Sequence, residues 1–296
     1  MPSPPIVQLC VNACMGCVTE YRTLHLGKYV ILISGCSNKD GEKHDLEGSN
    51  PCTCLPSNSF GRALSSLKHL NSLNLFACKN LNSAGLQVIA DGCPSLEIIN
   101  IDEVNYLSDD SFIYFISKTK DRLLQFVIDG ESLTDKSFSA FGNLAKLQLL
   151  SISFADNMGS QGLLAISKLS NLEYLQIRRG NDLRALDFVR TFDKKRLEKL
   201  LLLNLSECSK LSDLSLMTIA MNCPKLATLT LAWCWELTDV SLKSVVKHCK
   251  LLINLNLCGV VKLLGDFIGD IPRSLHFLKE LAILIYHISG RLIFLI

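Results

Sequence analysis

Residues 208–259 read CSKLSDLSLMTIAMNCPKLATLTLAWCWELTDVSLKSVVKHCKLLINLNLCG and contain one pattern twice. Each copy runs from a cysteine through Leu-Ser-Asp or Leu-Thr-Asp and an apolar stretch to a second cysteine, and then into the phrase Leu-x-x-Leu-x-Leu. Equivalent residues are 26 positions apart, because Cys208 is followed by Cys234 and Leu226 by Leu252. A fixed period of this length predicts a chain of stacked, similar units.

The same frame extends over most of the 296-residue chain. Its leucine phrases open at residues 70, 96, 123, 147, 172, 200, 226, 252 and 278, with steps of 24 to 28 residues. This is the period of leucine-rich repeats. One strand and one helix cannot bury both their faces alone, so neighbouring repeats must stack. We therefore expect an α/β solenoid, or horseshoe, with a parallel inner sheet and outer helices, built from about nine repeats over residues 61–290.

Three recurring features predict the local structure of each repeat. Apolar and polar residues alternate in Leu229-Thr230-Leu231, which is the period of a strand with one buried face. Serine or threonine before aspartate predicts a helix start, because these side-chain oxygens accept the first amide hydrogens of a helix. In Cys93-Pro94 and Cys223-Pro224, the proline disfavours helical geometry at the cysteine and ends the helix. The predicted helix starts are Ser108-Asp109, Thr134-Asp135, Ser212-Asp213 and Thr238-Asp239.

The two ends of the chain depart from this pattern. Residues 1–60 form an irregular segment, whose strand-like pieces allow one or two degenerate repeats. Residues 291–296 form an apolar tail, which we interpret as a repeat cut short. A membrane helix is the alternative for this end, but Lys279, Glu280, His287 and Arg291 interrupt it below the ~20 apolar residues that a spanning helix needs.

Composition limits the compartment and the partners. A net charge of +2 gives no electrostatic reason to expect nucleic acid, and no membrane partner is expected. The start Met1-Pro2-Ser3-Pro4-Pro5 lacks the basic and apolar parts of a secretory signal. The 13 cysteines are odd in number, and many recur at fixed places in the repeats, which favours reduced thiols over a disulfide framework. Reduced thiols predict a cytoplasmic or nuclear protein.

The stretch 208–259 resembles the cysteine-containing leucine-rich repeats of F-box proteins. That subtype has the same period, a cysteine after the strand, Thr-Asp or Ser-Asp before the helix and Cys-Pro after it. The resemblance covers roughly residues 70–290. It implies a substrate-recognition arm of a cullin-type ubiquitin ligase, with a protein substrate on the concave face and the ligase adaptor as a second partner. The helical F-box that would dock the adaptor is not visible in residues 1–60, so the chain is a fragment, a splice form or a relative without adaptor docking.

The strand residues that point away from the core are the candidate binding residues. They lie two, four and six places after the first leucine of each repeat, on the concave side of the sheet, and the residues just beyond them lie close by. Arginine and aromatic residues are the types that most often dominate protein interfaces. The candidates are Asp102, Asp129, Tyr174, Gln176, Arg178, Arg179, Glu207, Trp233 and Trp235.

The sequence gives little support for catalysis, a cofactor or a metal. Cys10, Cys14 and Cys17 have the spacing of a radical iron–sulfur site, and Cys14, Cys17, Cys52 and Cys54 could supply four zinc ligands, but ordinary cysteines explain both groups. His248-Cys249 ends a repeat helix and is explained by packing. We expect no catalytic residues. The alternative to the ligase arm is a leucine-rich interaction scaffold without ligase association.

Overall fold

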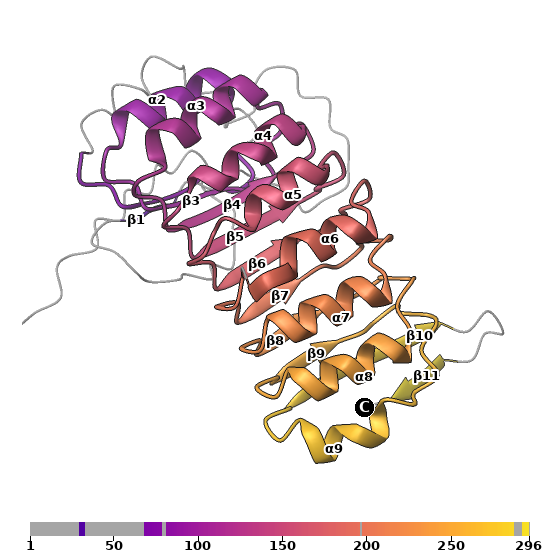
Figure 1. The fold of residues 1–296 in the computed structure, drawn as a ribbon. Coiled ribbons are helices and arrows are strands. Elements are labelled where there is room, and N and C mark those ends of the chain that lie inside the picture. Colours follow the sequence, from indigo (N-terminus) through magenta and orange to yellow (C-terminus); the bar gives the residue numbers. More distant parts are fainter. Residues whose placement is uncertain (1–29, 33–67, 79–80, 196, 287–291, 296) are drawn as a thin grey trace, which may run out of the picture.

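The computed structural model describes residues 30–32, 68–78, 81–195, 197–286 and 292–295. Within these residues the chain forms one sheet in which the spatial order of the strands follows the sequence (Figure 1). Every neighbouring pair from β1 to β10 is parallel, and β11 pairs with β10 antiparallel. The strands are β1 (Val30–Leu32), β2 (Ser72–Asn74), β3 (Ile98–Ile101), β4 (Gln125–Asp129), β5 (Leu149–Ser153), β6 (Tyr174–Ile177), β7 (Leu202–Asn204), β8 (Thr228–Thr230), β9 (Asn254–Asn256), β10 (Glu280–Tyr286) and β11 (Leu292–Leu295).

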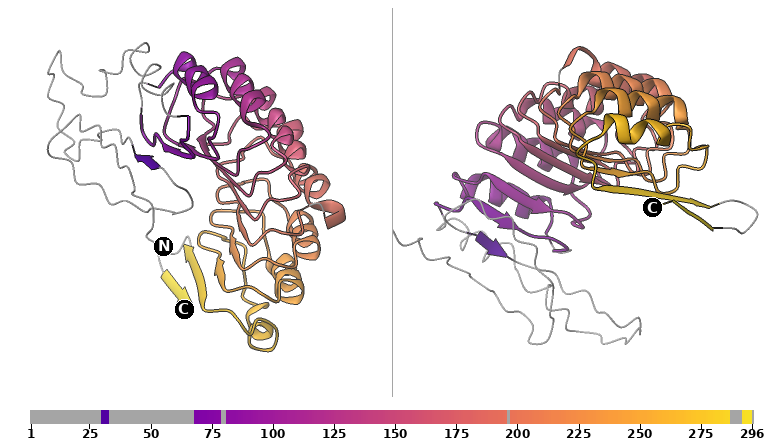
Figure 2. Two further views of the ribbon diagram at one scale, coloured as in Figure 1. Left: turned by 90° about the vertical axis from the view of Figure 1, so that its left-hand side faces the viewer. Right: turned by 90° about the horizontal axis from the view of Figure 1, so that it is seen from below.

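Helices follow the strands and cover the outer side of the sheet. The left-hand view of Figure 2 shows the helices on the convex side of an arc and the strands along its concave side. This arrangement confirms the predicted leucine-rich-repeat solenoid. The helices are α2 (Ser83–Gly92), α3 (Asp109–Thr119), α4 (Asp135–Ser139), α5 (Ser160–Ile166), α6 (Ala185–Phe192), α7 (Asp213–Asn222), α8 (Asp239–His248) and α9 (Ile271–Ser274), with 3-10 turns η2 (Ala140–Asn143), η3 (Asp193–Lys195) and η4 (Ile268–Asp270).

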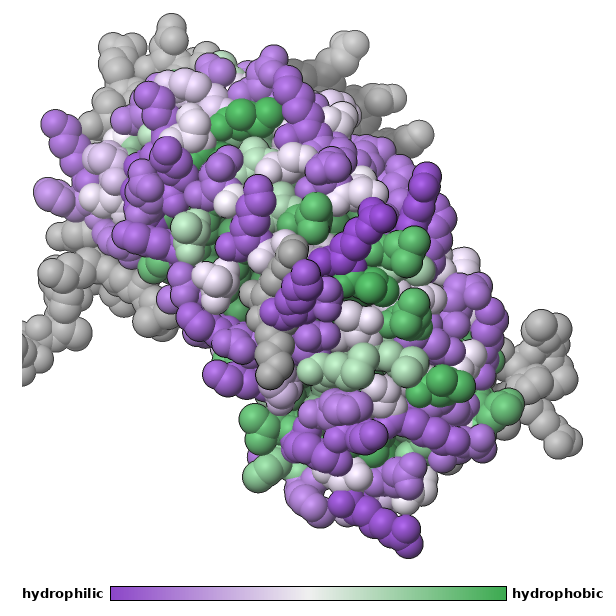
Figure 3. Space-filling model, viewed as in Figure 1, coloured by the Kyte–Doolittle hydropathy of each residue, from purple (hydrophilic) through white to green (hydrophobic). Residues whose placement is uncertain are grey.

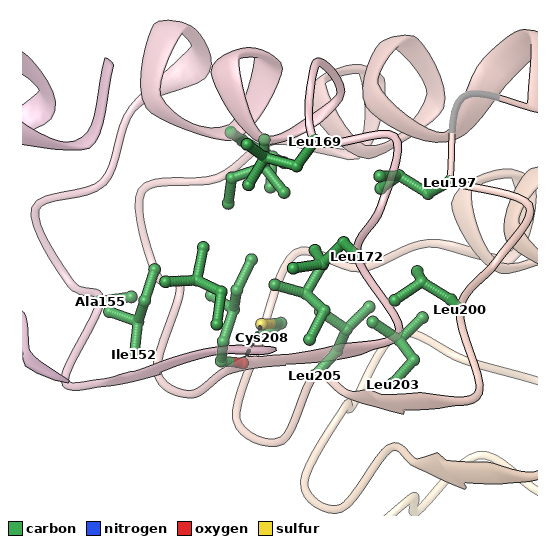
Figure 4. Close-up of a cluster of buried hydrophobic side chains, with 14 of the residues drawn as sticks. Ile152, Ala155, Leu169, Leu172, Leu197, Leu200, Leu203, Leu205 and Cys208 are labelled. Atoms are coloured by element: carbon green, nitrogen blue, oxygen red, sulfur yellow. Dashed lines mark hydrogen bonds between the residues drawn. The ribbon is translucent and has the colours of Figure 1, made fainter. Parts of the chain in front are cut away.

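The leucines of the repeat phrase fill the space between sheet and helices. In Figure 4, Leu203 and Leu205 lie on the sheet side, while Leu169 and Leu197 lie beneath the helices. All four are at most 1% exposed. The helical face of the molecule is mostly hydrophilic, with scattered hydrophobic residues (Figure 3). Burial of the repeated leucines against the adjacent repeats is the main force that stacks the units.

The predicted helix starts are confirmed. Ser108, Thr134, Ser212 and Thr238 each occupy the N-cap and accept a hydrogen bond from a backbone N–H of the first turn. The helices α2 and α7 also end as predicted, with Cys93 and Cys223 at their C-caps. Helix α4 is short, with only five residues, and the chain continues from it as the 3-10 turn η2.

The cysteines of the repeats connect neighbouring units. The Cys208 thiol donates to the Ile177 carbonyl oxygen at 3.6 Å, and the Cys234 thiol donates to the Leu205 carbonyl oxygen at 3.1 Å. Burial raises the pKa of Cys208 to about 12, so its thiol stays protonated and remains a hydrogen-bond donor. This geometry is the reason for a small, weakly polar residue after these strands.

The aspartates that follow the helix caps also join one repeat to the next, in a set of contacts we name the carboxylate ladder. Asp109 accepts from the Thr134 N–H at 3.0 Å, and Asp213 accepts from the Thr238 N–H at 2.9 Å. Asp135 accepts three backbone N–H groups at the start of α5, whose N-cap Gly159 has no side chain to perform this role. Asp239 similarly accepts three backbone N–H groups from residues 264, 265 and 267. The carboxylate of one repeat therefore caps the turn of the next.

Phenylalanine side chains join the leucines in the core around β4. Phe126 of β4 is fully buried and stacks on Phe112 of α3, with ring centroids 5.4 Å apart. Its ring also meets Phe115 at 5.6 Å and Phe141 of η2 at 6.0 Å. These rings pack together across the repeats that contain α3 and α4. We name them the phenylalanine cluster.

The C-terminal tail lies beside the last parallel strand. Residues 292–295 run antiparallel to β10 as β11, so the described part of the tail forms a hairpin arm. The cysteines considered for iron–sulfur or zinc binding, and nearly all of the irregular segment 1–60, lie outside the described residues. Among the residues that are described, no helix is long and apolar enough to cross a membrane.

Candidate functional site

A left-handed residue follows the strand in almost every repeat. It stands seven places after the first leucine, and we name it the left-handed position. Gly130, at the equivalent place after β4, does not share this conformation. Residues other than glycine rarely adopt positive φ, so this recurrence is a property of the fold. The left-handed residues are Ala77, Glu103, Phe154, Arg179, Glu207, Trp233 and Gly259, with φ between 53° and 77°.

Backbone hydrogen bonds hold this position in register. The N–H of Arg179 donates to the Ser206 carbonyl oxygen at 3.1 Å, and the N–H of Glu207 donates to the Ala232 carbonyl oxygen at 2.8 Å. Trp233 repeats the contact with the Cys258 carbonyl oxygen at 2.8 Å. The chain turns out of the sheet here, so the side chains of successive repeats stand in a row along the edge where the parallel strands end.

Three consecutive repeats form an open hollow of about 400 Å³ at this edge. Arg179, Glu207 and Trp233 come from the left-handed position, and Asn181, Ser209 and Trp235 lie two residues further along each repeat. Both indoles are solvent-accessible, with 42% of Trp233 and 51% of Trp235 exposed. We name this hollow the tryptophan pocket. It combines two tryptophans with an arginine, and these residue types are enriched at the energetic centres of protein interfaces.

Ion pairs fix the arginines beside the pocket. An Nη of Arg178 lies 3.1 Å from an Oε of Glu207, and an Nη of Arg179 lies 3.3 Å from an Oδ of Asp156. The Arg179 guanidinium also stacks over the Phe154 ring, with its Cζ 5.0 Å from the ring centroid. Each arginine thus has an acidic partner within the protein.

Gly259 provides the surface on which Trp233 lies. A Cβ at Gly259 would come within 2.6 Å of the indole carbons, and the residue has a φ of +77°. Other repeats carry larger residues in this conformation, so glycine is required here by the close approach of the ring. The indole of one repeat therefore packs on the backbone of the next.

The sheet face beside the pocket carries the candidates of β6. Tyr174 is 39% exposed, Gln176 is half-buried and accepts from the Asn204 amide at 3.2 Å, and Arg178 is exposed. These three lie on the concave side as predicted. The structure brings Arg179, Glu207, Trp233 and Trp235 together in the pocket, with Arg178 at its border.

Asp102 and Asp129 lie apart from the pocket, at the ends of β3 and β4. Asp129 is only 5% exposed, which corrects the expectation that it stands open on the concave face. Burial raises the pKa of Asp129 to about 6, and the nearby carboxylates Asp102, Glu131 and Glu103 raise it as well. Burial also raises the pKa of Asp102, against a hydrogen bond from Ser153 at 3.4 Å. These carboxylates repel one another.

Asp129→Asn is expected to stabilise the protein by about 1–3 kcal/mol at pH 7, because a neutral amide removes a buried charge whose pKa is raised. The amide oxygen can still accept the Glu131 N–H that Asp129 accepts at 2.8 Å. Urea unfolding at pH 7 measures the effect. A lower unfolding midpoint in the variant would contradict the predicted repulsion.

Sequence reasoning missed the residues that complete the pocket wall. The Asn181 amide donates to Asp156 at 2.5 Å and accepts from the Ser209 hydroxyl at 3.1 Å, so a polar chain links three consecutive repeats. The signal is present in the sequence, because Asp156, Asn181, Ser209 and Trp235 share one place in the repeat frame. A selection by strand position and by aromatic or charged type leaves out the small polar residues among them.

The described residues contain no group of three or more histidine, cysteine or acidic side chains able to hold a metal ion. Burial raises the pKa of Cys249 to about 12, which is unsuited to a nucleophile beside His248.

Comparison with known proteins shows the fold alone. No family model and no curated protein sequence matches this chain. It is similar to a chain of the yeast Rad7–Elc1 complex, with a TM-score of 0.50 and 18% identity over 73% of this chain and 63% of that one. A chain of the TLR13–ssRNA13 complex gives a TM-score of 0.48 and 19% identity, over 74% and 33% of the two chains. The matched region thus spans less than two thirds of the length of each of these two proteins.

Proposed function

We propose that the protein is a non-catalytic, protein-binding module that recognises a substrate protein for a cullin-type ubiquitin ligase in the cytoplasm or nucleus. The observation that carries the binding part is the tryptophan pocket, where three repeats present two exposed indoles beside fixed charges. Large aromatic side chains on a rigid scaffold bury much area at little entropic cost, which favours a protein partner.

The ligase part rests on the repeat subtype. The cysteines after the strands, the Thr-Asp and Ser-Asp helix starts and the Cys-Pro helix ends resemble the repeats of F-box proteins, and each has a structural role between or within repeats. The similar yeast structure is also a two-protein complex, of Rad7 with Elc1. In this proposal the adaptor of the ligase is a second partner, bound outside the pocket.

Affinity purification of the tagged full chain from cells, followed by mass spectrometry, tests the proposal. Cullin, its adaptor and a protein whose abundance rises when the chain is depleted are expected to co-purify. Recovery of protein partners without any ligase subunit would instead favour the interaction scaffold, and recovery of neither would overturn both functions.

Trp235→Ala is expected to reduce recovery of the substrate protein about tenfold or more, because interface tryptophans commonly contribute at least ~1.4 kcal/mol to binding. Half of this side chain is exposed, so the unfolding midpoint should stay unchanged. Leu186→Ala is a matched control, since Leu186 is 57% exposed on α6 and does not line the pocket. Equal recovery of the substrate protein with both variants would show that the tryptophan pocket is not part of the interface.

A further inference from the structure

Four acidic residues gather where β3 and β4 end. The register places Ile101 opposite Ile128, so the next residues along the two strands, Asp102 and Asp129, are neighbours across the sheet. Glu103 and Glu131 follow them and are exposed. We name these four residues the acidic corner. It occupies the same edge as the tryptophan pocket, because both lie at the carboxyl ends of parallel strands.

The charges of the acidic corner are only partly compensated within the described part of the chain, where the nearby positive charge of Arg178 lowers the pKa of Asp102 against the effect of burial. None of the four carboxylates forms an ion pair there, and the Asp102 Oδ1 is buried without a hydrogen-bond partner. Burial and the acidic neighbours also raise the pKa of Asp129, which is consistent with an excess of negative charge at this corner. A cationic group placed over Glu103 and Glu131 would relieve this repulsion.

The positive charges between the corner and the pocket are already neutralised. Arg178 and Arg179 pair with Glu207 and Asp156, at 3.1 and 3.3 Å. A partner that approaches this edge therefore meets excess negative charge at β3 and β4, paired charges at β6, and exposed indoles at β8. Charge complementarity favours a partner that is basic at one end and apolar at the other.

The span between the two features sets the length of that partner. The carboxyl ends of β4 and β8 are four strand spacings apart, about 19 Å at about 4.8 Å per spacing. An extended chain advances about 3.3 Å per residue, so about six residues cover the distance. A short unfolded segment can thus reach both places at once.

We propose that this edge binds an extended segment of another protein, with lysine or arginine at the acidic corner and an aromatic or aliphatic side chain, about six residues away, in the tryptophan pocket. The proposal rests on the proposed protein-binding function, and it does not depend on association with a ligase.

Fluorescence anisotropy with labelled 14-residue peptides tests this specificity on the full chain. The probes carry two lysines and a tryptophan six positions apart, in both orders, in a glycine–serine background. Matched peptides replace both lysines with glutamate, or the tryptophan with serine. In low salt, at least one lysine–tryptophan peptide is expected to bind ten times more tightly than its glutamate counterpart, and the serine counterpart is expected to bind more weakly as well. Equal binding of the lysine and glutamate peptides, or no binding by either lysine peptide, would overturn the inference.

Variants of the corner separate recognition from folding. Asp129→Asn with Glu131→Gln is expected to weaken the lysine–tryptophan peptide at least fivefold, while circular dichroism stays unchanged and stability does not fall. Asp121→Asn is the control, because Asp121 is an exposed carboxylate before β4, at the opposite edge. Unchanged affinity in the double variant would overturn the inference. If a substrate and cullin are recovered from cells but the lysine and glutamate peptides bind equally, only this inference fails. If the lysine peptides bind more tightly but no ligase subunit is recovered, only the ligase proposal fails.

Discussion

Phe126→Ala is expected to lower the free energy of unfolding by about 3–5 kcal/mol, the range observed when a buried phenylalanine is truncated. Phe126 is fully buried and contacts three other rings of the phenylalanine cluster. Its loss leaves a cavity and removes the edge and stacking contacts that add to simple burial. Because each repeat is stable only through its neighbours, the defect should weaken the repeats on both sides.

Urea unfolding followed by circular dichroism measures this change, and hydrogen exchange shows where protection is lost. Phe277→Ala is the matched control, since Phe277 is 58% exposed and its truncation should cost less than about 0.5 kcal/mol. A Phe126 variant as stable as this control would mean that the cluster closes around the gap without loss.

Asp135→Ala is expected to cost about 2–4 kcal/mol, because three backbone N–H groups at the start of α5 lose a charged acceptor. The three hydrogen bonds run from Gly159, Gln161 and Gly162, at 2.9, 3.2 and 2.6 Å. Since Gly159 cannot cap its own helix, the first turn of α5 should fray. Hydrogen exchange at residues 159–166 and the urea midpoint report the two effects.

Asp135→Asn and Asp110→Asn complete the comparison. In Asp135→Asn, the amide oxygen can keep the two contacts now made by one carboxylate oxygen, so an intermediate loss is expected. Asp110 is exposed and forms a 2.7 Å ion pair with Lys136, and such solvent-exposed pairs contribute little to stability. Equal stability of Asp135→Ala and Asp110→Asn would show that the carboxylate ladder does not stabilise the array.

The aspartates of the carboxylate ladder and the buried Asp129 are expected to change the stability of the protein in opposite directions as the pH falls. Burial raises the pKa of Asp109 and Asp213, but hydrogen bonds from the next repeat outweigh it and leave both below the ordinary value of 3.8. Their stabilisation is complete above that value and is lost as the pH falls through the lower, folded-state pKa. Asp129 has a raised pKa, so its destabilising charge disappears as the pH falls below about 6. Wild-type stability, relative to Asp129→Asn, should therefore improve from pH 7 to pH 5.

The sequence predicts the parts of this fold that repeat locally. The leucine spacing, the Thr238 cap and the Cys223 helix end all depend on neighbouring residues, and each is found as predicted. Contacts between repeats are less accessible to such reasoning. Asp135 caps α5 of the next repeat, a contact between residues more than 20 positions apart in the sequence. The burial of Asp129 depends on packing around β4.

The candidate site was also predicted only in part, because some of its features depend on contacts between repeats. Position just beyond the strands, together with residue type, selected Arg179, Glu207, Trp233 and Trp235, and the fixed period places these residues side by side in the structure. The left-handed position was not predicted, since its residues are mostly not glycine and carry no turn signal. The compensation of Arg178 and Arg179 by specific carboxylates also required the three-dimensional arrangement.

At the left-handed position, the backbone contributes to folding, while the side chain is available for binding. Its contacts with the next repeat use the backbone N–H, as at Arg179, Glu207 and Trp233, so the register needs no particular side chain. Alanine, glutamate, phenylalanine, arginine and tryptophan all occupy this place in one molecule. In most repeats the side chain at this position can therefore change without loss of the contact that sets the register, so the binding surface can vary while the leucine pattern that determines the fold is kept.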